Sequence, residues 1–359
     1  MHGSCGLTEL SYSSIMKKTS RLGLLALALS GLAATGHAED RRTLTLSTYA
    51  VSQPGFERYV YTPFRAKCGC NLVVETGNNA DRIAKLDARR QNQVVDMVLF
   101  SDFGMLEAAR KGLVQPLDYG RLKNYDDLEP FAKDPVGGKF AVGYTAYSVG
   151  LVYRSDKLPA VTSWKDLWSP ALKGRVAMPD ITTTQGPLTL HMAEVSWGGT
   201  SPSYATGMDK VLANRGNVVT FVKNSAQLAA LFAQDEIWLA PVPRFVWAQM
   251  TKSGMPLKWA SPKEGQAAGL NVMGIVAGSK NADLAYQLMD FWLSKEVQTA
   301  LALNMIDSPV NKSVTLPKEI AEVSTYGEEQ MASLKFVKPD TILANRAGWV
   351  DAWNKGMAR

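Results

Sequence analysis

The sequence predicts an α/β protein of two lobes, each an α/β sheet domain, joined by two extended crossovers around a ligand cleft. Three observations support this fold class. The chain has 359 residues, 46% of them hydrophobic and 20% charged, which suits about two globular domains. Segments typical of strands and of helices alternate along it, which favours sheets covered by helices. Two extended, glycine-containing apolar stretches, 140–153 and 271–277, are suited to cross from one domain to the other.

The first 38 residues have the pattern of a secretory signal peptide. A basic stretch at 16–21 leads into an apolar run at 22–29, followed by small residues that end at Ala38. This order is typical of a cleavable signal, and the apolar run is too short to anchor the chain in a bilayer. Residues 1–15 have no role in such a signal, so translation could start at Met16. We therefore expect cleavage near Ala38 and a periplasmic location.

The alternation of elements can be followed through both expected lobes. In the first, strands at 44–49, 71–75 and 96–100 alternate with helical segments at 56–64, 82–90 and 105–111. In the second, a helical segment at 164–168 precedes strands at 176–178, 218–221 and 237–240, with a further helix beginning near Pro187. Helices are then expected at 282–293 and 296–303 and in the tail, 326–353. We assign 43–146 with 272–311 to lobe 1 and 147–271 with 312–359 to lobe 2.

Charge and motifs restrict the function. The formal net charge of +6 is spread without a run of four basic residues, which argues against a nucleic-acid partner. Neither Gly-x-Ser-x-Gly nor His-Glu-x-x-His occurs, so we expect no enzyme. A periplasmic enzyme is the rival class, and a Ser-His-Asp triad would have to use His191, the one histidine left after signal cleavage.

The cysteines give one further expectation. Cys68 and Cys70 are the two that remain after cleavage, too few for a four-cysteine zinc site, and we expect no metal and no cofactor. They could pair outside the cytoplasm, although a ring closed across one residue would be strained. We expect a structural rather than a reactive pair, and leave open whether it is bonded.

Several motifs resemble one family. Trp-Lys-Asp-Leu-Trp-Ser-Pro at 164–170, closed by Lys-Gly-Arg-Val-Ala-Met-Pro-Asp at 173–180, is similar to a segment of the solute-binding proteins of ABC importers. The branch is the one that holds spermidine/putrescine, ferric-iron, thiamine and phosphonate receptors. Pro-Lys-Glu-Gly at 262–265 resembles the motif before a crossover strand in its polyamine-binding members, and 272–293 and 307–311 resemble its later crossovers.

The resemblance runs in order from about residue 44 to 311. It implies a type II periplasmic binding protein that closes on a small solute and delivers it to an inner-membrane permease with a cytoplasmic ATPase. A closed receptor of this kind could also dock to a chemoreceptor.

Residues that could contact the solute follow from a general rule. Ligands of open α/β sheets bind beyond the carboxyl ends of the strands, where loops and helix N-termini meet. The residues that this rule selects are Thr48, Tyr49, Ser101, Asp102, Tyr147, Thr182, Thr183, Gln185, Arg244, Trp247 and Asn271.

The residue types indicate a zwitterionic or anionic solute, amino-acid-like or phosphonate-like. The polyamine-binding members carry an aromatic residue and a carboxylate where this chain has Gly269 and Asn271, and the turn 182–185 has no acid. Arg244 could grip an oxyanion in a bidentate way, and Asp102 could hold an amine. Tyr49, Tyr147 or Trp247 could stack on the solute. A polyamine or ferric iron is the alternative ligand, and the threonines could merely cap a helix while Arg244 forms a salt bridge.

Overall fold

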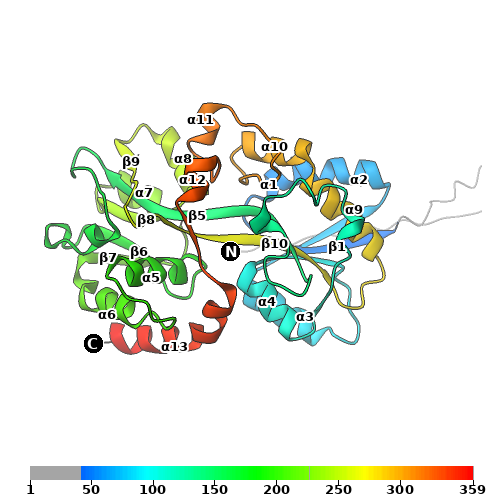
Figure 1. Cartoon of the computed structure of the whole chain (residues 1–359), viewed down its shortest axis with the longest axis horizontal. Helices are drawn as coiled ribbons and strands as arrows, with labels where there is room; N and C mark the ends of the chain where they lie inside the picture. The colour runs from blue at the N-terminus through cyan, green and yellow to red at the C-terminus, as the bar shows by residue number, and fades with distance from the viewer. Residues whose placement is uncertain (1–41, 226, 359) are drawn as a thin grey trace, which may run out of the picture. The chain divides into compact units, whose positions relative to one another are not determined.

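The structure, a computed structural model, describes residues 42–225 and 227–358. The expected signal peptide lies outside these residues. The described strands form one hydrogen-bonded sheet in the order β2-β1-β3-β10-β5-β8-β6-β7, with β4, β9 and β11 paired at its sides. Figure 1 shows two lobes that share β5 and β10, as the predicted fold class requires. The strands are β1 (Thr43–Thr48), β2 (Asn71–Thr76), β3 (Met97–Ser101), β4 (Val114–Gln115), β5 (Val142–Arg154), β6 (Val176–Pro179), β7 (Val218–Val222), β8 (Leu239–Pro243), β9 (Leu257–Trp259), β10 (Gln266–Val276) and β11 (Leu334–Phe336).

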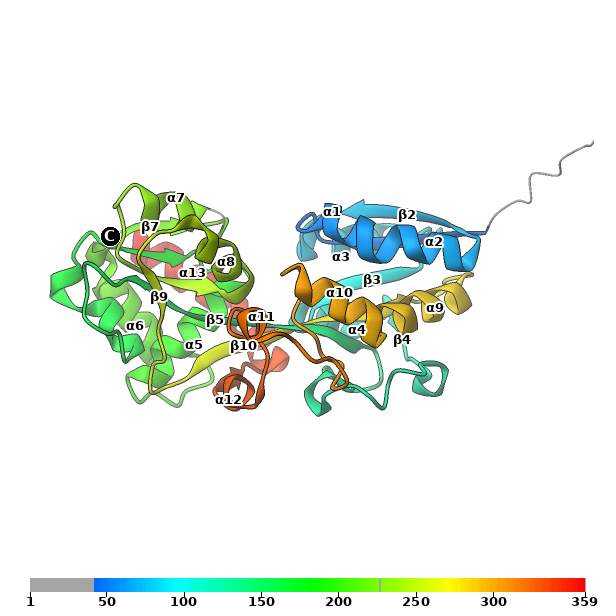
Figure 2. The same ribbon diagram turned by 90° about the horizontal axis from the view of Figure 1, so that it is seen from above.

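Helices cover both faces of the sheet in each lobe (Figures 1 and 2). In lobe 1, α1, α2, α9 and α10 share one apolar core, and α3 and α4 share another on the opposite face. In lobe 2, α5, α6 and α13 pack on one face, and α7 and α8 on the other. The helices are α1 (Gln53–Phe56), α2 (Thr62–Cys68), α3 (Asn79–Ala88), α4 (Asp102–Arg110), α5 (Gln185–Ser196), α6 (Ala205–Ala213), α7 (Gln227–Ala233), α8 (Arg244–Met250), α9 (Ala282–Leu293), α10 (Lys295–Leu303), α11 (Lys318–Ala321), α12 (Glu328–Ala332) and α13 (Pro339–Met357).

The two crossovers are β5 and β10, which pair antiparallel with each other from Ala267↔Val149 to Met273↔Val142. One part of β10 also pairs with β3, and the other end of β5 pairs with β8, so each strand belongs to both lobes. Every residue of β5 except Arg154 is buried. The predicted second crossover began at residue 271. It begins at Gln266 instead, because its first residues pair with β5 and with β11.

Glycines in the crossovers allow aromatic rings to lie directly against the backbone. A side chain at Gly150 would collide with the ring of Trp259, and one at Gly269 would collide with the hydroxyl of Tyr147. The apolar pattern shows the strands, but it does not show that these glycines make room for rings from other strands.

Several boundaries differ from the predicted ones for local reasons. α3 begins at Asn79, because the Asn78 side chain accepts from the backbone N–H of Asp81. α4 begins at Asp102, because Ser101 caps it by accepting from Gly104. Caps placed earlier than expected therefore lengthen both helices toward their N-termini.

In lobe 2, the predicted strand at 237–240 is β8, Leu239–Pro243, and it includes two prolines. A proline normally ends a central strand because it has no N–H to donate. Here β8 pairs with β6 only at Leu239, so Pro241 and Pro243 lie beyond the part of β8 that pairs with β6.

The two motifs of the resemblance contact each other. Residues 164–168 form a 3-10 helix rather than an α-helix, capped by Ser163. The carboxylate of Glu264, from the Pro-Lys-Glu-Gly motif, accepts from the Ser163 hydroxyl at 2.5 Å and from the Trp164 backbone N–H at 3.2 Å. The indole N–H of Trp164 donates to the carbonyl of Gly265 at 2.9 Å. The two motifs therefore form one structural joint in lobe 2.

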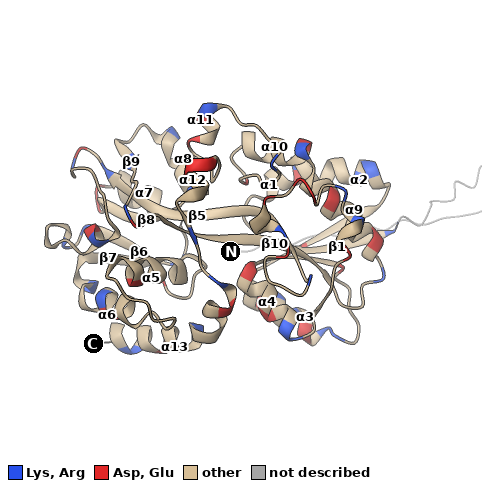
Figure 3. Ribbon diagram, viewed as in Figure 1, with Lys and Arg blue, Asp and Glu red and all other residues tan. Residues whose placement is uncertain are grey.

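Cys68 and Cys70 are joined by a disulfide. Gly69 between them adopts a left-handed backbone conformation with φ of 61° and terminates α2. The pair thus closes the turn from α2 into β2. Figure 3 shows acidic and basic residues interspersed along the ribbon of both lobes. Within 42–225 and 227–358, no helix is both long and apolar enough to cross a membrane.

The joint at Glu264 gives a prediction on stability. Replacing Glu264 with alanine removes the acceptor of two hydrogen bonds, so we expect the free energy of unfolding to fall by about 1–3 kcal/mol. Urea unfolding of Glu264→Ala measures it, with the exposed Lys263→Ala as the matched control. Equal stability of both variants and the wild type would show that the joint contributes nothing.

Candidate functional site

The structure brings together most of the candidates from lobe 1. Thr48 and Ser101 end the neighbouring parallel strands β1 and β3, so Tyr49 and Asp102 follow at the same edge of the sheet. Asn271 of β10 lies opposite Ser101. The Tyr49 hydroxyl donates to the Asn271 side-chain oxygen at 3.4 Å. This edge is therefore polar and aromatic, as the carboxyl ends of such strands were expected to be.

Arg82 joins the ends of β1 and β3 through hydrogen bonds to their backbone carbonyls. It is buried and donates to the carbonyls of Ser47 and Leu99 at 3.1 and 2.6 Å. Its guanidinium also lies 4.6 Å from the centre of the Tyr49 ring. Arg82 was not predicted from the sequence, and its role is to position Tyr49.

Asp102 is the charged group of this edge. It is buried, and its carboxylate accepts from the backbone N–H groups of Phe103 at 2.7 Å and Leu270 at 3.3 Å. Burial raises the pKa of Asp102 to about 7, although the two amide donors oppose the shift. A cation beside this carboxyl group would lower the pKa again, because it favours the ionised form. Tyr147 lies nearby on β5, opposite Gly269.

Two of the candidates in lobe 1 have local structural roles. Ser101 caps α4 and also accepts from the Asn79 side chain at 2.7 Å. Thr48 is fully buried at the end of β1. Both support the site without facing open solvent.

The threonine turn of lobe 2 is held mainly by Asp180. The Asp180 carboxylate accepts from the backbone N–H and the hydroxyl of Thr182 at 2.9 and 2.5 Å. Thr183 accepts from the Gly186 N–H at 3.0 Å in the first turn of α5, whereas Thr184, the N-cap residue, makes no capping hydrogen bond through its side chain. Gln185 is the first residue of α5, which begins two residues before Pro187.

Arg346 of α13 connects this turn with α4. Its guanidinium donates to the carbonyl of Thr182 at 3.2 Å and lies 5.5 Å from the centre of the Phe103 ring, next to Asp102. The sequence analysis missed Arg346, because nothing in the pattern of the tail helix shows which loop it reaches.

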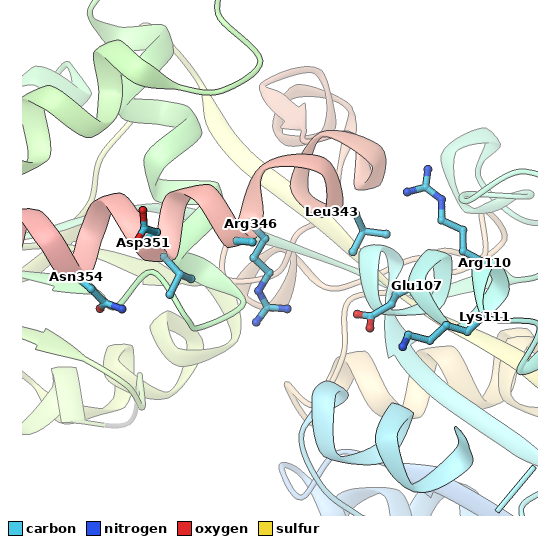
Figure 4. Close-up of a pocket in the computed structure, with 9 residues that line it drawn as sticks. Glu107, Arg110, Lys111, Leu343, Arg346, Asp351 and Asn354 are labelled. Atoms are coloured by element: carbon cyan, nitrogen blue, oxygen red, sulfur yellow. The ribbon is translucent and has the colours of Figure 1, made fainter. Parts of the chain in front are cut away.

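A groove of about 840 Å³ runs between α4 and α13. Figure 4 shows Arg346 from α13 and Glu107 from α4 pointing toward the gap between the two helices. An ion pair between Arg110 and Asp340 joins the helices. The residues that line the groove are Glu107, Arg110, Lys111, Leu343, Arg346, Ala347, Val350, Asp351 and Asn354.

Arg244 is the buried cation of lobe 2. It begins α8, is 6% exposed, donates through Nη2 to the carbonyl of Glu322 and lies 4.2 Å from the centre of the Trp259 ring. Its Nε and Nη1 are buried, and neither has a hydrogen-bond partner in the part of the chain that the structure describes. Burial lowers the pKa of Arg244 to about 10, so it stays charged at neutral pH.

The surroundings of Arg244 were not predicted. It lines a chamber of about 440 Å³ together with Trp259, Gln266 and Tyr326. Trp247, predicted to stack on a solute, is instead 8% exposed and belongs to the apolar core beneath α8. Its ring centre lies 5.9 Å from that of Trp259, so Trp259 is the ring that reaches Arg244.

Asp102 and Arg244 occupy equivalent positions in the two lobes. Each is the first residue of a helix that directly follows a strand, β3 or β8, and each of these strands pairs antiparallel with a crossover. One lobe thus places a buried acid, and the other a buried base, at matching points.

The comparisons with known proteins agree with this architecture. The family of bacterial extracellular solute-binding proteins matches residues 60–326. The spermidine/putrescine-binding periplasmic protein of Salmonella typhimurium is 25% identical over 333 residues, covering 90% of this chain and 88% of the relative. Iron uptake protein A1 of Synechocystis is 22% identical and covers 85% and 87%.

A solved structure extends the agreement to the fold. The crystal structure of an ABC transporter from Clostridium perfringens superposes with a TM-score of 0.77 and is 29% identical. The alignment covers 88% of this chain and 99% of that one. With a family match across most of the chain and two-lobed architecture, this protein belongs to the family of bacterial extracellular solute-binding proteins.

Proposed function

We propose that this protein is the periplasmic receptor of an ABC importer. It captures a small polar organic solute in a cleft between its lobes and delivers it to an inner-membrane permease with a cytoplasmic ATPase. The family match and the periplasmic relatives support this role. The proposal includes a signal peptide cleaved near Ala38, and a chemoreceptor as a further partner.

The solute that the geometry supports best is zwitterionic or anionic, amino-acid-like or phosphonate-like. The observation that carries this proposal is the guanidinium of Arg244, which is buried with two nitrogens that have no partner among the described residues. A buried charge with unpartnered donors costs free energy, and an oxyanion that accepted from either nitrogen would lower that cost. Although burial lowers the pKa of Arg244 to about 10, the guanidinium stays protonated at neutral pH and can bind an anion.

An amine on the same solute would meet the edge of lobe 1. Asp102 supplies the negative charge there, and Tyr49, Tyr147 and Asn271 supply aromatic surface and a polar contact. An amine is charged at neutral pH and favours the ionised form of a nearby carboxyl group.

A polyamine is the second candidate. It is favoured by the buried acid of lobe 1 and by the relative from Salmonella, which is named for binding spermidine and putrescine. A diammonium solute would leave Arg244 without a role. The effect of Arg244 on affinity therefore separates the two candidates.

The first experiment is a thermal-shift screen of the mature protein after unfolding and refolding to remove bound solute. The panel holds amino acids with 4-aminobutyrate, phosphonates, polyamines and ferric citrate. A ligand at a hundred times its Kd adds about 2.7 kcal/mol of stability. We then expect Arg244→Gln to weaken binding of the anionic or zwitterionic hit by about 2–3 kcal/mol, roughly 30- to 150-fold, measured by calorimetry.

The matched control is Arg42→Gln, which removes an exposed arginine paired with Asp283. Unchanged affinity in Arg244→Gln, or a hit list that holds only polyamines, contradicts the oxyanion proposal and leaves the receptor role standing.

The pKa of Asp102 predicts how stability depends on pH. Because folding raises this pKa, the folded state holds a proton that the unfolded state releases above about pH 4. The ligand-free wild type should therefore lose about 2–3 kcal/mol of unfolding free energy relative to Asp102→Asn between pH 5 and 7. The loss ends once the pH exceeds the folded pKa. Urea unfolding of both proteins across this range measures the difference, and parallel curves would contradict the raised pKa.

A further inference from the structure

A second acid, the half-buried Asp307, lies next to the edge of lobe 1 that holds the candidate site. It follows α10 in a turn where Met305 has a left-handed backbone conformation, with φ of 55°. The next residue, Ser308, is fixed to β5, since its N–H donates to the Thr145 hydroxyl at 3.1 Å and its carbonyl accepts from that hydroxyl at 2.9 Å. Thr145 in turn lies opposite Asn271.

The carboxyl group of Asp307 is incompletely satisfied. Its Oδ2 is fully enclosed, and no described residue donates a hydrogen bond to it. Burial raises the pKa of Asp307 well above its usual range. Buried polar atoms in folded proteins nearly always have partners, so an enclosed carboxyl oxygen without one needs an explanation.

The space beside Asp307 is small and mostly apolar. A pocket of about 20 Å³ is lined by Asp307 together with Phe245 and Ala248 of α8, and by Ile306 and Val323. That volume holds a group the size of one water molecule, and no larger part of a solute. Because α8 begins at Arg244, the helix that carries the buried cation of lobe 2 also forms one wall of this pocket.

An aromatic ring also lines the pocket. Phe245 of α8 is among its lining residues, and the face of an aromatic ring stabilises a cation. The pKa values of the buried Tyr61 and Tyr144 are raised by burial first, with the charge of Asp307 as a further cause. A carboxyl group at a water-sized pocket beside an aromatic ring matches a primary ammonium group.

We propose that Asp307 is an ammonium subsite of the receptor, and that the transported solute carries a primary amine that ends in this pocket. The proposal rests on the proposed function, because it takes the edge of lobe 1 as part of the solute site. It moves the direct contact with the amine from Asp102, whose carboxylate already accepts two backbone N–H groups, to Asp307. Asp102 then remains a charge at the same edge of lobe 1. The solute body lies outside the pocket, toward Tyr49 and Asn271.

The test uses a probe that carries only the head group. Methylammonium chloride is titrated against the refolded mature protein, with sodium chloride and tetramethylammonium chloride at equal ionic strength, and melting temperature is measured. We expect stabilisation by methylammonium alone, because tetramethylammonium exceeds the pocket. Asp307→Asn should abolish this response, and Asp283→Asn, an exposed acid, should keep it.

Two further readouts separate an ammonium subsite from a structural aspartate. Ligand-free Asp307→Asn should melt at or above the wild-type temperature at pH 8, since no described residue donates to the Oδ2 that is replaced; a lower melting temperature overturns the proposal. For an amine identified by the screen, Asp307→Asn should weaken binding at least tenfold. Equal responses of wild type and variant, no wild-type response to methylammonium, or loss only in Asp102→Asn each overturn it.

The probe has no oxyanion, so the result does not depend on Arg244. If methylammonium binds at Asp307 while Arg244→Gln leaves the affinity for every solute unchanged, the oxyanion proposal fails and the ammonium subsite stands. If Arg244→Gln weakens binding and Asp307→Asn does not, the ammonium subsite fails and the oxyanion proposal stands.

Discussion

The antiparallel ladder between β5 and β10 is the constraint on which the rest of the structure depends. Each strand must satisfy its backbone hydrogen bonds in two lobes at once, so neither can shift its register without unpairing buried groups. The ladder places Tyr147 against Gly269 and Thr145 opposite Asn271. Asp102 follows β3, which pairs with β10, and Arg244 follows β8, which pairs with β5. The turn at Asp307 is held to β5 through the hydrogen bond of Thr145. The positions of all three therefore depend on this ladder.

Enclosed polar atoms without hydrogen-bond partners lower the free energy of unfolding of the ligand-free protein. Arg244 and Asp307 each keep enclosed atoms for which the described chain supplies no partner. Groups of this kind destabilise a ligand-free protein, and they are typical of sites where a ligand completes the hydrogen bonding. In the proposed function, a ligand that satisfied these atoms would offset that cost, so stability and affinity would be linked through the same few atoms.

The sequence carried enough information for the fold and for part of the site. Periodicity showed the strands and both crossovers, and the rule of strand ends led to Tyr49, Asp102 and Asn271, which do lie at one edge. It could not show that Arg244 would reach the carbonyl of Glu322, because that contact depends on the packing of a segment far along the chain. Asp307 and Arg346 were missed for the same reason. The sequence also could not show that Trp247, a candidate to stack on the solute, packs into the apolar core with Trp259.

The joint between Glu264, Ser163 and Trp164 explains why the class of this protein is easier to recognise than its solute. The two motifs that carry the resemblance hold each other together inside lobe 2, and Trp164 is fully buried there. They are a signature of how the scaffold is assembled. A sequence signature that arises from the scaffold carries no information about the bound solute. Receptors can therefore share it while transporting chemically unrelated molecules.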